Sequence, residues 1–79
     1  MTKRVIIRDG QKNIVSILFI EEDSKLSYRK NFTVSGTNLI NIDLYLKDNY
    51  IGSVQCWKGT VEESIMIRNE DGMLVEKEV

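Results

Sequence analysis

Hydrophobic and polar residues alternate along most of this 79-residue chain, as they do in β-strands that bury one face. Polar turn residues interrupt the alternation and divide the chain into expected strands at residues 3–8, 11–20, 25–35, 39–46, 50–57, 61–68 and 73–79. The third of these has one face made of Leu26, Tyr28, Lys30, Phe32 and Val34. The pattern predicts an all-β fold, or a β-rich fold with at most one short helix. We expect a small antiparallel barrel or sandwich of about six or seven short strands.

Residues 39–57 give the most specific prediction of strand register. A three-residue loop at 47–49 would align four apolar pairs on one face: Leu46 with Tyr50, Leu44 with Gly52, Ile42 with Val54 and Ile40 with Cys56. A two-residue loop would instead set Ile42 against Gln55, which is a poorer match. Because side chains alternate with a period of two, the three-residue loop predicts that Cys56 faces inward.

The opposite face of this hairpin is the surface that we expect to bind a partner. In the predicted register Tyr45 faces Ile51, Asn41 faces Gln55 and Leu39 faces Trp57. Exposed aromatic residues beside amides are typical of recognition surfaces, since aromatic anchors dominate interface energetics. The candidate protein-binding residues are Leu39, Tyr45, Ile51, Gln55 and Trp57. The alternative is that this face is itself the core or lies under another strand, with Trp57 buried.

Near the N-terminus, Asp9-Gly10 is a strong signal for a two-residue turn, which would pair Val5 with Ile14. The strand that follows is apolar on both faces. One face carries Ile14, Leu18 and Ile20 around Ser16, and the other carries Val15, Ile17 and Phe19. A sandwich strand normally buries one face, so we expect a loop or a partner chain to cover the other. A homodimer is therefore an expectation from this strand.

The C-terminal part of the chain allows two interpretations. Thr60 and Glu63 form a capping-box pattern, which would begin a short helix over 61–68. The β-rich run Ile65-Met66-Ile67 favours a strand there. The absence of alanine fits a chain with few helices. If 61–68 is a strand, a four-residue loop at 69–72 would pair Ile67 with Leu74 and Met66 with Val75.

Charge is unevenly distributed, although the formal net charge is only −1. Residues 1–30 carry a net +3 and residues 59–79 carry a net −4. The simplest interpretation is that the two ends pair across a sheet and neutralise each other. The alternative is a basic surface that binds single-stranded nucleic acid by phosphate contact and stacking. The candidate residues for that alternative are Arg4, Arg8, Tyr28, Arg29 and Lys30.

The chain lacks most of the residue types and motifs that catalytic or metal-binding sites need. The chain has no histidine, so a histidine-based triad or an imidazole ligand is excluded. A single cysteine does not build a thiolate zinc site, and the isolated glycines do not form a phosphate-binding loop. Cys56 has no histidine to act as its base, so we interpret it as a small buried hydrophobe. We therefore expect no enzyme activity, no metal and no cofactor.

Length and composition indicate the number of domains, the cellular compartment and the source of the chain. The chain is of a size for one globular domain, 1–79, with a modest core. No apolar run approaches the roughly 18–20 residues of a membrane helix, and no signal-peptide pattern opens the chain, so we expect no membrane association. A lone cysteine favours the reducing cytoplasm. Abundant isoleucine, asparagine and lysine suggest an AT-rich genome, such as that of a bacterium or its phage.

These observations predict a non-enzymatic module that acts through protein–protein interaction, such as a small regulator or inhibitor that docks onto a larger protein. A small-barrel nucleic-acid-binding protein is the first alternative, and an oligomeric structural subunit that uses its strand edges is the second. Salt separates the first two classes, because phosphate binding weakens steeply as salt rises and an apolar interface changes little.

Overall fold

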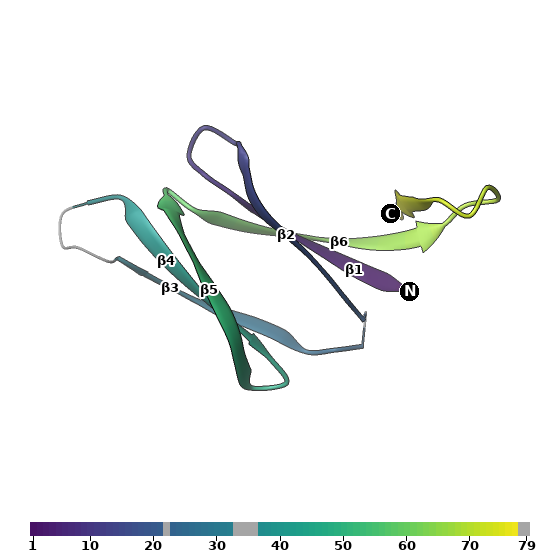
Figure 1. Cartoon of the computed structure of the whole chain (residues 1–79), viewed down its shortest axis with the longest axis horizontal. Helices are drawn as coiled ribbons and strands as arrows, with labels where there is room; N and C mark the ends of the chain where they lie inside the picture. The colour runs from purple at the N-terminus through teal and green to yellow at the C-terminus, as the bar shows by residue number, and fades with distance from the viewer. Residues whose placement is uncertain (22, 33–36, 78–79) are drawn as a thin grey trace.

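The structure is a computed structural model that describes residues 1–21, 23–32 and 37–77. Within these residues the chain forms seven β-strands and no helix (Figure 1), which confirms the all-β prediction. The strands are β1 (Thr2–Arg8), β2 (Ile14–Glu21), β3 (Leu26–Phe32), β4 (Leu39–Leu46), β5 (Asn49–Trp57), β6 (Thr60–Arg68) and β7 (Leu74–Glu76). They form two separate antiparallel sheets rather than one closed barrel. Part of the third expected strand, including Val34, lies outside the described residues.

The four-stranded sheet has the order β2-β1-β6-β7, with β1 between its two neighbours. As an interior strand β1 buries the consecutive residues Val5, Ile6 and Ile7. Residues 61–68 are a strand here and not the short helix that was the alternative. Pairing with β1 satisfies the backbone groups that residues 60–66 turn toward it, an option that a local capping pattern does not reveal.

The loop between β1 and β2 differs from the sequence prediction. A two-residue turn at Asp9-Gly10 is wrong, because the loop has five residues, 9–13. Val5 consequently pairs with Leu18 and not with Ile14. The side chain of Asp9 stabilises this longer loop, and so the turn geometry is set by a side chain rather than by glycine.

Asp9 organises the loop through hydrogen bonds to its own neighbours. Its Oδ1 accepts hydrogen bonds from the backbone N–H groups of Gln11 and Asn13, both at 2.9 Å. Lys12 occupies a left-handed conformation with φ of 68°, and its N–H donates to the carbonyl of Asp9 at 3.0 Å. The Arg8 guanidinium donates to the carbonyl of Lys12 at 2.9 Å. These bonds close a defined loop of the kind that Asp favours.

The same arrangement recurs in the loop between β6 and β7. The Oδ1 of Asn69 accepts hydrogen bonds from the N–H groups of Asp71 and Met73, both at 3.0 Å. Gly72 takes the left-handed position with φ of 79°, and Arg68 donates to the Gly72 carbonyl at 2.6 Å. Each loop therefore has an arginine, an Asp or Asn directly after it, and a left-handed residue three positions further on.

This second five-residue loop shifts the predicted C-terminal register by one residue. Ile67 pairs with Val75 and Met66 with Glu76, so the predicted pairs with Leu74 and Val75 are wrong. A loop of five residues instead of four moves every later partner by one position. The last strand is short within the described residues, spanning only Leu74–Glu76.

The three-stranded sheet has the order β3-β4-β5 and contains the hairpin predicted over 39–57. Five of the predicted pairs are confirmed: Leu39 with Trp57, Ile40 with Cys56, Asn41 with Gln55, Ile42 with Val54 and Leu44 with Gly52. The predicted common face of Leu26, Tyr28 and Lys30 is confirmed. On the other side of β4 these residues lie opposite Leu46, Leu44 and Ile42, and they stand on the same side of the sheet as those residues.

Near its turn this hairpin departs from prediction. The turn has two residues, Lys47 and Asp48, which both have positive φ, at 49° and 66°. A bulge then adds an extra residue, Ile51, before the predicted register resumes at Gly52. Gly52 has φ of 149°, a conformation that residues with a side chain rarely adopt, and so it suits the chain next to the bulge.

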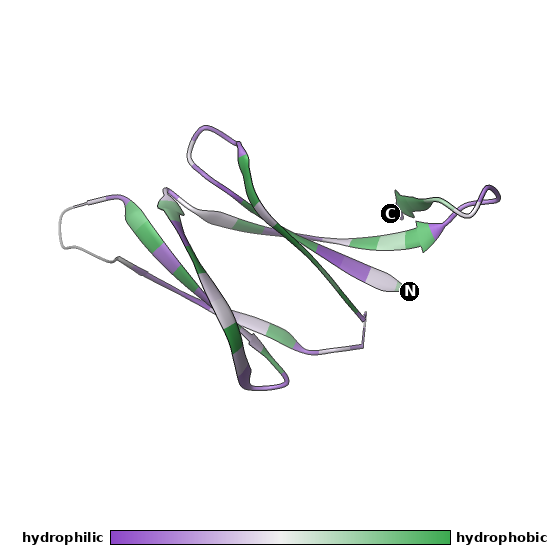
Figure 2. Ribbon diagram, in the orientation of Figure 1, coloured by the Kyte–Doolittle hydropathy of each residue, from purple (hydrophilic) through white to green (hydrophobic). Residues whose placement is uncertain are grey.

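The core lies between the two sheets and is small. Its buried members are Ile7 from the four-stranded sheet and Ile40, Ile42, Leu44 and Cys56 from the three-stranded sheet, with Val54 and Val61 packed against them. Figure 2 shows the hydrophobic positions spread over strands of both sheets. The prediction that Cys56 faces inward is confirmed by its 9% exposure. Burial of this apolar surface is the main favourable term that holds the sheets together.

Strand β2 has an irregularity that changes the predicted faces of its apolar run. Arg8 pairs with Ile14 and Ile7 with Ser16, so Val15 is the extra residue of a bulge. Because a bulge shifts the alternation by one residue, Ile14 joins the face of Arg8 and Ile17. The predicted grouping of Ile14 with Leu18 and Ile20 is therefore wrong.

Candidate protein-binding face

The outward side of the three-stranded sheet is a face built by rows of residues that cross β3, β4 and β5. The strand register aligns Ser27 with Tyr45 and Tyr50, Arg29 with Asp43 and Ser53, Asn31 with Asn41 and Gln55, and Leu39 with Trp57. Because cross-strand partners share a side of the sheet, these residues lie on the face opposite Ile40, Ile42 and Leu44. We call this surface the outer face.

Aromatic residues and an arginine gather at the end of the outer face near the β4–β5 turn. The rings of Tyr45 and Tyr50 meet edge to face, with centroids 5.8 Å apart and planes at 66°. The Cζ of Arg29 lies 5.9 Å from the centroid of Tyr45, within the range of a cation–π contact. Tyrosine offers a large aromatic area at little cost in side-chain entropy, because its side chain has few rotatable bonds.

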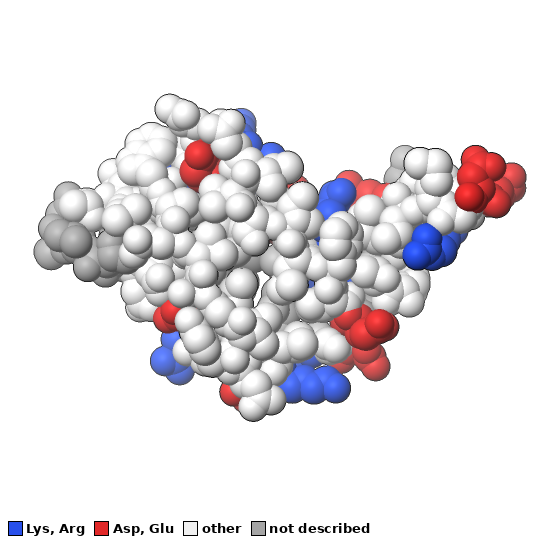
Figure 3. Space-filling model, viewed as in Figure 1, with Lys and Arg blue, Asp and Glu red and all other residues white. Residues whose placement is uncertain are grey.

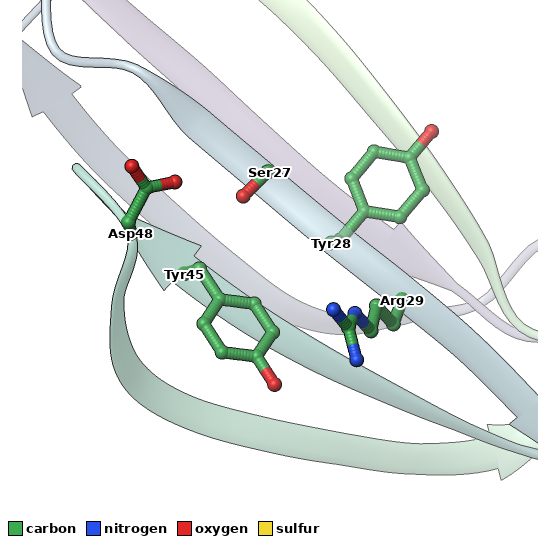
Figure 4. Close-up of a pocket in the computed structure, with 5 residues that line it drawn as sticks. All are labelled: Ser27, Tyr28, Arg29, Tyr45 and Asp48. Carbon is green, nitrogen blue, oxygen red and sulfur yellow. The ribbon is translucent and has the colours of Figure 1, made fainter.

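An open hollow of about 390 Å³ adjoins this cluster, lined by Ser27, Tyr28, Arg29, Tyr45 and Asp48. Figure 4 shows the side chain of Arg29 on the same side of β3 as the Tyr45 ring, while Tyr28 points to the other side. Asp48 stands at the turn, so the hollow presents a carboxylate, a guanidinium and the ring of Tyr45. Such a mixture suits a polar side chain of a partner.

The middle of the outer face is polar. The carboxylate of Asp43 accepts hydrogen bonds from Nδ2 of Asn41 at 2.8 Å and from Nδ2 of Asn31 at 3.5 Å. Gln55 is exposed beside Asn41. These amides retain donors and acceptors that a partner backbone can use.

Trp57 and Leu39 form the other end of the outer face. Trp57 is 46% exposed, so it is not the buried core residue that was the alternative. Its ring is nevertheless held: the Nζ of Lys58 lies 4.8 Å from the ring centroid, and Gly10 packs against the six-membered ring. The N–H of Gly10 also donates to the Trp57 carbonyl at 2.8 Å. Trp57 thus presents a fixed, half-exposed surface.

The predicted protein-binding residues are brought together with one exception. Leu39, Gln55 and Trp57 are exposed and Tyr45 is half-buried, all on the outer face. Ile51 is exposed, but it sits in the bulge, so its predicted pairing with Tyr45 is wrong. Tyr50 takes that place. A three-residue loop sets Tyr50 on the inner face, so the alternation pattern does not identify it as a residue of the outer face. Lys47 and Asp48 both have positive φ, as a two-residue hairpin turn requires. The residue types at these two positions do not predict that turn.

The candidate nucleic-acid-binding residues are divided between the two sheets. Arg4 and Arg8 lie on β1, whereas Tyr28, Arg29 and Lys30 lie on β3. The basic residues of β1 face acids on the neighbouring C-terminal strands. The ion pairs are Lys3 with Glu63 at 3.5 Å, Arg4 with Glu76 at 3.6 Å and Arg8 with Glu62 at 3.0 Å. The expected neutralisation of the two chain ends across a sheet is present in these pairs.

In the view of Figure 3, most lysine, arginine and acidic side chains lie toward the margins of the molecule, and acidic side chains gather at the β6–β7 turn. The described residues contain no group of three or more Asp, Glu or Cys side chains arranged to hold a metal ion. Burial raises the pKa of the Cys56 thiol, with a further contribution from the charge of Asp9. A raised pKa disfavours the thiolate, so this cysteine has the character of a packing residue.

The chain matches no protein-family model, no curated protein and no solved structure. Its class therefore comes from the fold: an all-β protein of two antiparallel sheets, with a mixed aromatic and polar face on the three-stranded sheet. In the part of the chain that the structure describes, no helix has the length and apolar character needed to cross a membrane.

Proposed function

We propose that this chain is a non-enzymatic interaction module that binds a larger protein through the outer face, as a small regulator or inhibitor. The observation that carries the proposal is the arrangement of Trp57 at one end and the Tyr45–Tyr50 pair at the other, with amides between. Aromatic anchors around a polar centre are the composition of protein-binding surfaces. The buried, free Cys56 agrees with a reducing cytoplasm, which we include in the proposal.

A protein partner fits this face better than a nucleic acid. Arg29 is the basic residue on the rows of the outer face, and Asp43 lies directly across from it. Phosphate recognition depends on several uncompensated cations, since each neutralised phosphate releases counterions. The ion pairs of Arg4 and Arg8 with acids weaken the case for β1 as a phosphate-binding strand.

The test is capture of a partner with matched variants. The biotinylated chain is used to capture proteins from a bacterial lysate, the bound protein is identified and purified, and its affinity is measured by calorimetry. Trp57→Ala and Tyr45→Ala should each lower that affinity by about thirtyfold or more, as expected for anchors worth about 2 kcal/mol. Met73→Ala is the control, because Met73 is an exposed hydrophobic residue in the loop between β6 and β7 and lies outside the outer face.

The result that would overturn the proposal is equal affinity of all three variants and the parent. Thermal unfolding of the same samples shows whether a lost interaction reflects lost structure. A bound species that is nucleic acid, with affinity that falls steeply between low and high salt, would favour the alternative class instead.

A further inference from the structure

Strand β2 forms one edge of the four-stranded sheet and carries an exposed apolar row. Ile17 is 48% exposed and Phe19 is 53% exposed, although both lie in the middle of the strand. Val15, at the bulge, and Ile14 are exposed as well. Figure 2 shows β2 as hydrophobic along nearly its whole length. This row belongs to the other sheet from the outer face, so it is a separate surface.

The edge lacks the usual protection against pairing with another strand. Natural sheets commonly place lysine, proline or an inward-pointing charge on an exposed edge. Over Ile14–Glu21 the sequence has no lysine, arginine or proline, and its one charge, Glu21, is at the end. The bulge at Val15 disturbs the start of the strand, but the run from Ser16 to Glu21 keeps a regular register with β1. That regular run is free to accept a strand along its outer edge.

A second copy of the same strand is complementary to this run. Antiparallel pairing about Leu18 sets Ser16 opposite Ile20 of the second copy and Ile17 opposite Phe19 of the second copy. A two-fold axis then repeats each pair, so the exposed row of one copy continues into the exposed row of the other. Pairs of a β-branched and an aromatic residue stabilise adjacent strands.

The charges at the two ends of β2 also match in this orientation. Lys12 precedes the strand, and Glu21 ends it with Asp23 close behind. An antiparallel pair brings the Glu21 end of β2 in one copy toward the end that Lys12 precedes in the other, so opposite charges approach. A parallel arrangement would bring like charges together at both ends, which is unfavourable.

We propose that two copies of this chain associate edge to edge through β2, in antiparallel register about Leu18. The order β2-β1-β6-β7 of one copy then continues across the axis into the same order of the second. The pairing sets Ile17 and Phe19 of each copy beside Phe19 and Ile17 of the other and satisfies the backbone groups along the outer edge of the strand. It leaves the outer face of the other sheet available, so it is independent of the function proposed above.

Sedimentation equilibrium of the whole chain over a wide concentration range tests the association. The parent should behave as a dimer that dissociates on dilution, whereas the double variant Ile17→Lys, Phe19→Lys should stay monomeric at every concentration. Ile51→Lys is the matched control, because Ile51 is 45% exposed on the other sheet; this variant should dimerise like the parent. A monomeric parent, or a double variant that dimerises equally well, would overturn the proposal.

A second measurement uses the unaltered sequence, so its result does not depend on whether the lysine variant folds. A one-to-one mixture of isotope-labelled and unlabelled chains is examined by NMR for contacts that arise only between copies. We expect contacts between the Ile17 methyl groups and the Phe19 ring. A dimer whose intermolecular contacts lie on the outer face, at Trp57 or Tyr50, would refute pairing through β2.

Discussion

The backbone N–H of Gly10 donates a hydrogen bond of 2.8 Å to the carbonyl of Trp57, and the Trp57 ring occupies the place where a β-carbon on Gly10 would stand. A β-carbon there would lie 2.5 Å from Cζ3 of the indole. The β1–β2 loop of one sheet is thereby joined to the end of β5 in the other. This contact also holds the ring, which remains 46% exposed.

Gly10→Ala should destabilise the protein by about 1–3 kcal/mol, because the added methyl group collides with the ring and forces it or the loop to move. Urea unfolding followed by circular dichroism gives the change. In a Trp57→Ala background Gly10→Ala should destabilise the protein clearly less. Some destabilisation should remain, because the added β-carbon would lie 2.8 Å from Cβ of Lys58. Equal costs in the two backgrounds would contradict the contact, since only interacting sites depart from additivity.

Asp9 should make the stability of the β1–β2 loop depend on acidity. Hydrogen bonds from the backbone of Asn13, and then of Gln11, lower the pKa of the Asp9 carboxyl. The folded state thus favours the charged form, so its stabilising effect is present above the unfolded pKa of about 4 and is lost as pH falls through the folded value. Urea midpoints measured between neutral pH and acid should show this loss in the parent.

Asp9→Asn is the informative variant for this loop. Asn69 makes the equivalent two hydrogen bonds with its amide oxygen, so asparagine at position 9 should keep the loop. The loss of stability at acid pH that the Asp9 carboxyl causes should be absent from the Asp9→Asn variant. Asp9→Ala should lower stability at neutral pH, because both loop amides lose their acceptor. If the alanine variant matched the parent, the loop would not depend on this side chain.

Cys56 should react slowly with a thiol reagent in the native protein and quickly in denaturant. Burial raises the pKa of this thiol, and its Sγ faces the Arg8 carbonyl at 3.9 Å. Both effects reduce the accessible thiolate, which is the reacting species. Thr60→Cys in a Cys56→Ser background is a suitable control, since Thr60 is exposed and should react quickly in the native state. Comparable native rates for the two sites would mean that the register of β5 is shifted by one residue.

Tyr50 should contribute to partner binding although the sequence pattern placed it on the inner face. Its ring contacts Tyr45, so Tyr50→Ala removes an exposed aromatic surface and also loosens its neighbour. We expect a loss of affinity comparable to that of Tyr45→Ala, and a double variant that loses less than the sum of the two single losses. Calorimetry with the purified partner gives the three values. Strict additivity would show that the two rings act separately.

The alternation of residues by itself determined the strands and most of the faces. Ile40, Ile42 and Cys56 are inward in the structure because a period of two leaves no other way to bury them together. The same pattern put Leu39, Gln55 and Trp57 outward. Identification of 61–68 as a strand also followed from its β-branched residues, although a local capping pattern opposed it.

Loop lengths and the pairing of distant strands were decided only by the tertiary structure. The loops at 9–13 and 69–73 depend on hydrogen bonds that backbone amides donate to the side-chain oxygens of Asp9 and Asn69. A loop that is longer than predicted displaces every partner that follows it. The turn at Lys47-Asp48 uses left-handed residues that carry side chains, for which composition gives no signal. The neighbours of β1 and the edge position of β2 come from contacts far apart in the chain, which no local pattern contains.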